Sequence, residues 1–371
     1  MSVKTRLQEE CLRALGVQQP TVPQRAVRGA LAVTALGYGV GVRLRNAAYT
    51  LGLLPVQRLS CRVVCVGNLT VGGTGKTPTV IALARCLTNA GRKVAVLLRG
   101  YGRAGTGVEV VSDGRDLFLD WRRAGDEAIL LAKSLPGVPI VVGGDRVAAG
   151  RLAVRRYGPD TLLLDDGFQH RQLHRDLDLV LLDATDPFGG DRLLPRGRLR
   201  EPVAGLTRAH GVILSRADQA SELTALRRHL ERLIPDIPKI LTRHRPSGLT
   251  ELAGGEERPL ESLRGRRVLA LSGIANPLTF HRTLVDLGAV LAGRLAFPDH
   301  HPYGPADLAR VEAMAREAGA ESIVTTEKDA VRILAGPSYR PILVLRVDLK
   351  ITEGADLLEG LLMLYTGGAR G

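Results

Sequence analysis

The stretch Val66-Gly-Asn-Leu-Thr-Val-Gly-Gly-Thr-Gly-Lys-Thr-Pro78 decides the fold. It follows Arg62–Val66, an apolar run that predicts a strand, and it opens a stretch of helical character at Thr77–Ala90. Glycines between a strand and a helix let the backbone curl, so that successive N–H groups converge on an anion at the helix N-terminus. The segment therefore predicts a phosphate-binding loop, made by Thr70, Val71, Gly72, Gly73, Thr74, Gly75, Lys76 and Thr77.

Two side chains of this loop predict the nature of the ligand. Lys76 would reach the outer phosphates of ATP, and the hydroxyl of Thr77 would ligate Mg²⁺. The loop departs from the usual pattern, because Thr70 stands where a glycine is expected six residues before the lysine. The pair Gly72-Gly73 instead resembles a variant with a lysine before the glycines, where this chain has Val71. A glycine-rich turn without a ligand is the alternative, and the register of strand, Gly-Lys-Thr and helix disfavours it.

A second apolar run, Thr161–Leu164, leads directly into Asp165 and Asp166. A phosphate loop needs a carboxylate at the end of a neighbouring strand to hold Mg²⁺. Capping of a following helix would explain one of the two aspartates but not both. We therefore expect this pair to organise the metal, whereas Asp183, at the end of the next strand, is expected to be a cap.

Apolar runs alternate with helical stretches along most of the chain, which predicts an α/β fold. Continuous apolar strands separated by helices are typical of a parallel sheet covered by helices on both faces. Prolines at positions 235, 238 and 246 thin this pattern. The sequence therefore predicts a phosphate-loop (P-loop) core over residues 59–235 and a second, smaller α/β domain over 236–371, after N-terminal membrane-associating helices in 1–58.

The charge balance narrows the class of partner. The chain has 371 residues and a net charge of +13, from 51 Lys and Arg against 38 Asp and Glu. Such a surface attracts nucleic acid, anionic membranes or phosphorylated substrates. A nucleic-acid binder is disfavoured, because the chain has few aromatic residues and no recognisable reading module. The four cysteines form no CxxC pair, so we expect reduced, buried thiols rather than a zinc site.

The N-terminal region carries two short apolar stretches, 29–42 and 47–56. The first has 14 uncharged residues, fewer than the roughly 18–20 that a spanning helix needs. Residues 1–28 are polar and charged, which argues against a signal peptide. Arginines flank the first stretch, which favours helices lying in the membrane interface. A helical pair packed on the main domain is the alternative. The flanking arginines are Arg25, Arg28, Arg43 and Arg45.

Transfer of a phosphoryl group to an alcohol needs a group that accepts the hydroxyl proton. The candidates are Asp126, in Gly125-Asp-Glu127, and the pair His300-His301. Taken alone, the Gly-Asp-Glu segment is typical of a helix cap and the histidine pair of a surface loop.

The motifs taken together, in this order, resemble those of the lipid A 4′-kinases (tetraacyldisaccharide 4′-kinases) of Gram-negative bacteria. The resemblance spans most of residues 60–330. Besides the phosphate loop, the matching blocks are Arg99-Gly-Tyr-Gly-Arg103, Gly125-Asp-Glu127, Leu164-Asp-Asp-Gly-Phe-Gln-His-Arg171, Leu193-Leu-Pro-Arg-Gly-Arg-Leu-Arg-Glu-Pro202, Asp299-His-His301 and Thr325-Thr-Glu-Lys-Asp329. One departure is Arg196, where a small residue is expected.

The resemblance implies transfer of the ATP γ-phosphate to the 4′-hydroxyl of a lipid A precursor, a tetraacyl disaccharide 1-phosphate. It places this reaction at the cytoplasmic face of the inner membrane, with Mg²⁺ and without nucleic acid. It also implies that Asp126 is the base, aided by His300 from the other domain, and that Asp165 and Asp166 organise Mg²⁺. The residues that it places along the active site are Arg99, Tyr101, Gln169, Arg200 and Glu201.

A P-loop GTPase or metallochaperone-type regulator is the competing class. It predicts a guanine-reading Asn-Lys-x-Asp after a strand. The nearest string is Thr326-Glu-Lys-Asp329, with Glu where Asn should stand, so the sequence favours a kinase.

Overall fold

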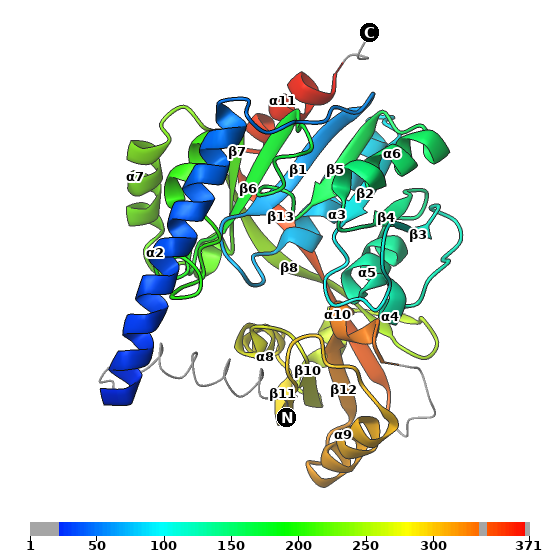
Figure 1. Cartoon of the computed structure of the whole chain (residues 1–371). Helices are drawn as coiled ribbons and strands as arrows, with labels where there is room; N and C mark the ends of the chain where they lie inside the picture. Colours follow the sequence, from blue (N-terminus) through cyan, green and yellow to red (C-terminus); the bar gives the residue numbers. More distant parts are fainter. Residues whose placement is uncertain (1–21, 334–339, 368–371) are drawn as a thin grey trace.

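The computed structural model describes residues 22–333 and 340–367, and its strands form one 13-stranded sheet (Figure 1). The order is β11-β10-β12-β13-β8-β7-β6-β1-β5-β2-β4-β3, with β9 beside β8. The strands are β1 (Arg62–Asn68), β2 (Val94–Leu98), β3 (Glu109–Ser112), β4 (Ile140–Val142), β5 (Thr161–Asp165), β6 (Leu177–Asp183), β7 (Gly211–Ser215), β8 (Lys239–Glu251), β9 (Glu257–Arg258), β10 (Arg267–Ser272), β11 (Val290–Ala296), β12 (Ser322–Thr326) and β13 (Ile342–Glu353).

The helices follow the strands in the alternating manner that the sequence predicted. The α-helices are α2 (Val22–Thr50), α3 (Lys76–Asn89), α4 (Trp121–Ala124), α5 (Asp126–Ser134), α6 (Arg146–Tyr157), α7 (Leu223–Leu233), α8 (Pro277–Asp286), α9 (Pro305–Glu317), α10 (Glu327–Ala330) and α11 (Ala355–Thr366). Short 3-10 helices lie at Val203–Arg208, Ala217–Gln219 and Leu260–Leu263. The predicted α/β class with a mainly parallel sheet is confirmed.

The sheet consists of two parallel parts joined by one antiparallel pair. Strands β8, β7, β6, β1, β5, β2 and β4 run parallel, and we call this part, with its helices, the phosphate-loop half. Strands β11, β10, β12 and β13 also run parallel and form the C-terminal half. The long strands β8 and β13 pair antiparallel and connect the halves (Figure 1).

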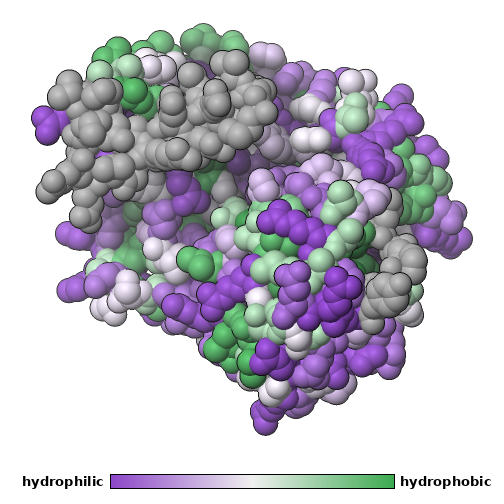
Figure 2. Space-filling model, turned by 90° about the horizontal axis from the view of Figure 1, so that it is seen from below, coloured by the Kyte–Doolittle hydropathy of each residue, from purple (hydrophilic) through white to green (hydrophobic). Residues whose placement is uncertain are grey.

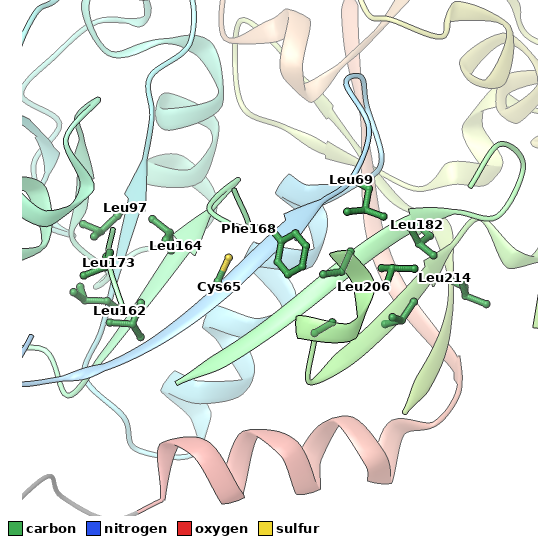
Figure 3. Packing of buried hydrophobic residues seen from close by; sticks show 14 of the residues in the cluster. Cys65, Leu69, Leu97, Leu162, Leu164, Phe168, Leu173, Leu182, Leu206 and Leu214 are labelled. Atoms are coloured by element: carbon green, nitrogen blue, oxygen red, sulfur yellow. The ribbon is translucent and has the colours of Figure 1, made fainter. Parts of the chain in front are cut away.

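Helices cover both faces of the phosphate-loop half because alternate residues of each strand point to opposite sides. In β1, Val63 and Cys65 point into one core and Val64 and Val66 into the other. The first core contains Phe168, whose ring lies beside Cys65 in Figure 3. Helices α6 and α7 close this core, whereas α3, α5 and α11 close the second. Continuous burial of the strands explains their unbroken apolar sequences.

The cysteines only partly follow the prediction. Cys61 and Cys65 are buried in one hydrophobic cluster, as their spacing along a strand predicted. Cys86, on α3, is exposed, so the expectation of burial was wrong for this residue. The structure does not describe Cys11, which lies among residues 1–21. In the described ranges, no group of three or more His, Cys, Asp or Glu could by itself hold a metal ion.

Two elements differ from the prediction. The prolines at 235, 238 and 246 only thin the pattern, and no strand was predicted there, but β8 runs through Pro246, where a register shift in the β8–β13 ladder accommodates the missing N–H. The N-terminal region was expected to form two short helices. In the described residues, it instead forms the single helix α2 of 29 residues, which continues through Arg43 and Arg45.

Helix α2 buries one face and exposes an apolar stripe. Ala35 and Val42 are buried, and the hydroxyl of Tyr38 donates a hydrogen bond to the carbonyl of Arg200 at 2.7 Å. On the outer face, at helical spacing, four large apolar side chains are exposed by 53–71%: Val33, Leu36, Val40 and Leu44. None of the described helices is long and apolar enough to span a bilayer.

The C-terminal half has its own hydrophobic clusters on both faces of β10 and β12. Its outer end carries a mixture of hydrophilic and hydrophobic residues in Figure 2. After β13 the chain returns to the first half, where Leu358 and Leu362 of α11 join the core under α3 and α5 (Figure 1). The division of the chain at residue 235 remains a prediction, and α11 packs with the part before that boundary.

Candidate active site

The phosphate loop connects β1 to α3, and its backbone is held from several sides. Gly75 adopts a φ of 90° immediately before α3 begins at Lys76, a conformation that favours glycine. The amide of Asn68 donates to the carbonyl of Thr70 at 2.7 Å, and the hydroxyl of Ser215 donates to the carbonyl of Thr74 at 2.8 Å. The backbone of Gly72 and Gly73 is exposed. This geometry presents backbone N–H groups and a helix N-terminus to an anion.

Lys76 of the phosphate loop lies beside Asp166, the second of the two aspartates that were predicted to hold Mg²⁺. Lys76 Nζ is 3.7 Å from Asp166 Oδ1, and Arg200 Nη1 donates to the same oxygen at 2.7 Å. Burial alone would raise the pKa of Asp166, but these two cations outweigh it, and the net pKa lies below its usual value. Asp166 has a φ of 56°, a strained conformation for a residue with a side chain. The Asp166 carboxylate is therefore ionised and fixed in place.

Asp165 has the opposite environment. It is buried at the end of β5, and its Oδ1 atom has no hydrogen-bond partner. Burial, followed by the charge of Glu127, raises its pKa to about 7. A buried carboxylate oxygen without a partner is costly unless a cation satisfies it. Mg²⁺ is commonly held by one or two carboxylates together with nucleotide phosphates, so the pair Asp165 and Asp166 fits this ion.

The structure brings Asp126 and His300 together although 174 positions separate them in the chain. Asp126 begins α5 and is buried, whereas His300 lies in the loop after β11. His300 Nδ1 lies 2.9 Å from Asp126 Oδ2. This hydrogen bond, opposed by burial, raises the pKa of His300. Burial would raise the pKa of Asp126, but the hydrogen bond from His300 and nearby cations lower it overall.

The neighbour of His300 has a different position. The ring of His301 stacks on Phe297 at 4.4 Å, and its Nε2 atom lies 3.1 Å from Asp307 Oδ2. These contacts hold His301 within the C-terminal half, apart from Asp126. Of the two histidines, the structure places His300 and not His301 in contact with Asp126.

Three other predicted residues form a polar cluster between the phosphate-loop half and α2. Gln169 Nε2 donates to Glu201 Oε1 at 2.9 Å, and Asn46 Nδ2 of α2 donates to Glu201 Oε2 at 3.1 Å. Glu201 is fully buried and also pairs with Arg208 at 2.7 Å. Arg200, which joins this cluster to Asp166, accepts from Tyr38 through its carbonyl. Helix α2 therefore contacts the site directly.

The segment after β2 forms the exposed side of the site. Residues 99–103, residues 105–107 and Gly144 line an open hollow of about 440 Å³. Tyr101 is 75% exposed, and its ring centroid lies 6.4 Å from that of His300. Burial lowers the pKa of the Arg146 guanidinium to about 10, and the nearby charge of Arg99 contributes to this lowering. The predicted lining residues thus lie around one edge of the sheet, with Tyr101 next to the Asp126–His300 pair.

Comparison with known proteins assigns the chain to a family. A family model described as LpxK, tetraacyldisaccharide-1-P 4'-kinase, matches residues 27–365. The chain belongs to this family. Tetraacyldisaccharide 4'-kinases from Anaeromyxobacter sp. (strain K) and Syntrophus aciditrophicus are 47% and 43% identical to it. These alignments cover 95% and 88% of the chain, and 94% and 90% of the two relatives.

A solved structure supports the same assignment. The crystal structure of LpxK from Aquifex aeolicus in complex with ATP matches with a TM-score of 0.74 and 32% identity. The match covers 92% of this chain and 99% of the other. As a member of the tetraacyldisaccharide 4'-kinase family, the protein is a kinase, that is, a phosphotransferase. The family that the sequence motifs resembled is confirmed.

Some side chains of the kinase site were not identified from the sequence. Arg198 Nε donates to the carbonyl of Val71 at 3.0 Å, and Arg216 Nη2 donates to the carbonyl of Gly73 at 3.0 Å. Ser215 also donates to the backbone of the phosphate loop, and Asn46 donates to the side chain of Glu201. Arg198 lies in a block that matched the family, which was an available signal. Arg216 follows an apolar strand without any motif that marks it.

Proposed function

We propose that this kinase transfers the γ-phosphoryl group of ATP to the 4′-hydroxyl of a tetraacyl disaccharide 1-phosphate, with Asp126 as the base. The observation that carries this proposal is the 2.9 Å contact between Asp126 and His300, next to Glu127, whose charge acts on Asp165 as does that of Lys76. Membership of the family supports the substrate class, and the ATP complex of the Aquifex aeolicus relative supports the donor.

The phosphate loop and its neighbours would bind and orient the triphosphate. Backbone N–H groups of residues 70–77 and the ammonium of Lys76 would neutralise the charge that spreads over the transferred group. Asp165, whose Oδ1 has no protein partner, would hold Mg²⁺ together with the hydroxyl of Thr77. When bound, Mg²⁺ would supply positive charge that stabilises the charge developing on the transferred phosphoryl group. Asp166, whose charge Arg200 and Lys76 partly balance, would help to organise the ion and would also hold these two cations in place.

The acceptor would enter beside the open hollow that residues 99–103 and 105–107 line. The 4′-oxygen attacks the γ-phosphorus, the bond from that phosphorus to the bridging oxygen of ADP breaks, and the hydroxyl proton moves to Asp126. His300 donates its Nδ1–H to Asp126 and so keeps the carboxylate oriented. Because these residues come from the two halves of the sheet, we propose that approach of the halves completes the site.

We propose that the kinase works at a membrane surface, with α2 as the contact. The exposed stripe that begins at Val33 and ends at Leu44 would enter the acyl boundary, as interfacial helices do. A net charge of +13 would attract the surface to anionic lipids and to the phosphate of the acceptor. The inner-membrane face would give the enzyme access to an acylated substrate that does not leave the bilayer.

The proposal is tested by transfer of labelled phosphate from ATP to a purified tetraacyl disaccharide 1-phosphate in detergent micelles. We expect one labelled product, bearing the new phosphate at the 4′ position, and no product from an acceptor whose 4′-hydroxyl is replaced by hydrogen. Transfer that is equally fast with the 4′-deoxy acceptor, or the absence of transfer with ATP and Mg²⁺, would contradict the proposal.

A further inference from the structure

A lysine outside the predicted site contacts the far side of His300. Lys328 belongs to the short helix α10, which directly follows β12 in the C-terminal half. Its ammonium nitrogen lies 3.3 Å from His300 Nε2. The same nitrogen lies 3.4 Å from Glu127 Oε1 and 3.5 Å from Asp299 Oδ1. Lys328 therefore touches residues of both halves while pointing at the imidazole.

The chemistry of this contact fixes the location of the histidine proton. An ammonium group can only donate hydrogen bonds, so His300 Nε2 must accept and carries no proton. The proton of the neutral ring therefore sits on Nδ1, which faces Asp126 Oδ2 at 2.9 Å. A donor on one ring nitrogen sets the tautomer at the other. Hydrogen bonds are therefore donated in one direction, from Lys328 to His300 and from His300 to the carboxylate of Asp126.

A buried arginine on the next turn holds the same carboxylate. Arg332 is 1% exposed, and its Nη1 atom forms an ion pair with Asp126 Oδ2 at 3.2 Å. Arg332 is itself anchored, because it pairs with the fully buried Asp329 and donates to the carbonyl of Gly273 at 3.0 Å. Asp329 in turn accepts from the hydroxyl of Tyr303 at 3.0 Å. The C-terminal half therefore supplies a rigid support that reaches across to Asp126.

We propose that Lys328 is a positioning residue of the phosphoryl-transfer site, which holds His300 in the Nδ1–H tautomer so that this histidine can orient the Asp126 carboxylate. Lys328 positions the carboxylate through His300 and touches no reacting atom, and its charge also lowers the pKa of Asp126 directly. During transfer, the proton of the acceptor hydroxyl moves to Asp126, and no bond to Lys328 forms or breaks. The inference rests on the proposed roles of Asp126 and His300.

The charges around Asp126 and His300 predict how loss of Lys328 changes the pH dependence of the transfer rate. His300 is faced by Asp126, Asp299 and Lys328, and Lys328 is faced by those two aspartates, Glu127 and Arg332. Lys328 lowers the pKa of both Asp126 and His300. Without its charge both pKa values rise, so the base stays protonated to a higher pH. The acidic limb of the rate profile should therefore move toward higher pH.

The test compares Lys328→Met with Lys328→Arg, which keeps the charge and a donor. The matched control is Lys133→Met, which removes an exposed lysine from α5. We expect Lys328→Met to lower kcat by about tenfold, less than the roughly 10²–10⁴-fold that a general base itself contributes, with the KM for ATP unchanged within about twofold. The acidic limb of the Lys328→Met rate profile should move to higher pH. Lys328→Arg should recover most of the lost kcat. The control Lys133→Met should behave as the wild type.

A double-mutant cycle that combines Lys328→Met with His300→Ala separates the positioning role of Lys328 from a merely structural one. If Lys328 positions Asp126 through His300, Lys328→Met should change kcat by less than about twofold in the His300→Ala background, measured at a pH above the acidic limb, where Asp126 is ionised in both variants. An equal loss in both backgrounds, or an unmoved acidic limb, would overturn the inference. Should Lys328→Met unfold, Lys328→Gln replaces it in the same cycle. An inactive wild type would instead refute the proposed function, so the two failures are distinguishable.

Discussion

Replacing Asp165 with asparagine is expected to stabilise the metal-free protein while abolishing phosphoryl transfer. The carboxyl is buried, its Oδ1 has no partner, and burial raises its pKa from 3.8 to about 7. At about 1.36 kcal/mol per pKa unit, this rise corresponds to at most about 4 kcal/mol of destabilisation above pH 7. Asparagine has nearly the same shape and no charge, so the variant avoids this cost but cannot hold Mg²⁺ as a carboxylate does.

The sign of the pH dependence follows from the direction of the shift. Between the unfolded pKa of 3.8 and the folded pKa of about 7, the folded state of the wild type binds the extra proton. Raising the pH through this window therefore destabilises the wild type relative to Asp165→Asn. The difference in unfolding free energy should grow by about 2 kcal/mol between about pH 5 and about pH 7.5.

Urea unfolding in the presence of a chelator measures this difference directly. Because the wild type and the variant share all other titrating groups, comparing them isolates Asp165. The matched control is Asp236→Asn at an exposed turn, which should leave stability unchanged. Addition of Mg²⁺ and ATP should stabilise the wild type more than the variant, since only the wild type binds the ion. A variant no more stable than the wild type at about pH 7.5 without metal would refute the reasoning.

Three further predictions concern the phosphate loop, the proton acceptor and α2. Lys76→Ala should remove most transfer, because its charge faces the developing γ-phosphoryl, and near-normal turnover would exclude the loop assignment. Asp126→Ala and His300→Ala should each lower kcat by about 10²–10⁴ with little change in ATP affinity, and the double variant should be little worse. Multiplicative losses would show that the two act independently. Val33→Glu with Leu36→Glu should release the protein from anionic vesicles, whereas high salt should release the wild type only partly. Complete release by salt alone would argue against apolar insertion.

The phosphate-loop half could be predicted from the sequence because its signals are local. The glycines before Lys76, the apolar strand before Asp165 and the alternation of strands and helices each lie within a few residues of the feature they mark. Glycines in left-handed turns and continuous burial of parallel strands produce recognisable sequence patterns. The edge at which these residues meet then follows from the parallel arrangement.

The parts that the sequence did not predict depend on distant contacts. Strand β8 continues past Pro246 because it pairs with β13, which lies about a hundred positions later in the chain. Helix α2 continues through Arg43 and Arg45 because one of its faces packs near Arg200 and Glu201. Lys328 lies in a block that was recognised, but only the fold shows that it meets His300. No local pattern encodes such pairings.

The return of α11 to the first half has a consequence for how the chain acquires its structure during synthesis. The core under α3 and α5 includes Leu358 and Leu362, among the last described residues. While the ribosome is still adding the C-terminal half, part of that core stays open to solvent, since its covering helix does not yet exist. Contacts between such distant positions form slowly, and exposed apolar surface invites association with chaperones or other nascent chains. Loss of α11 should therefore impair production of folded enzyme, although every side chain proposed to act in catalysis is retained.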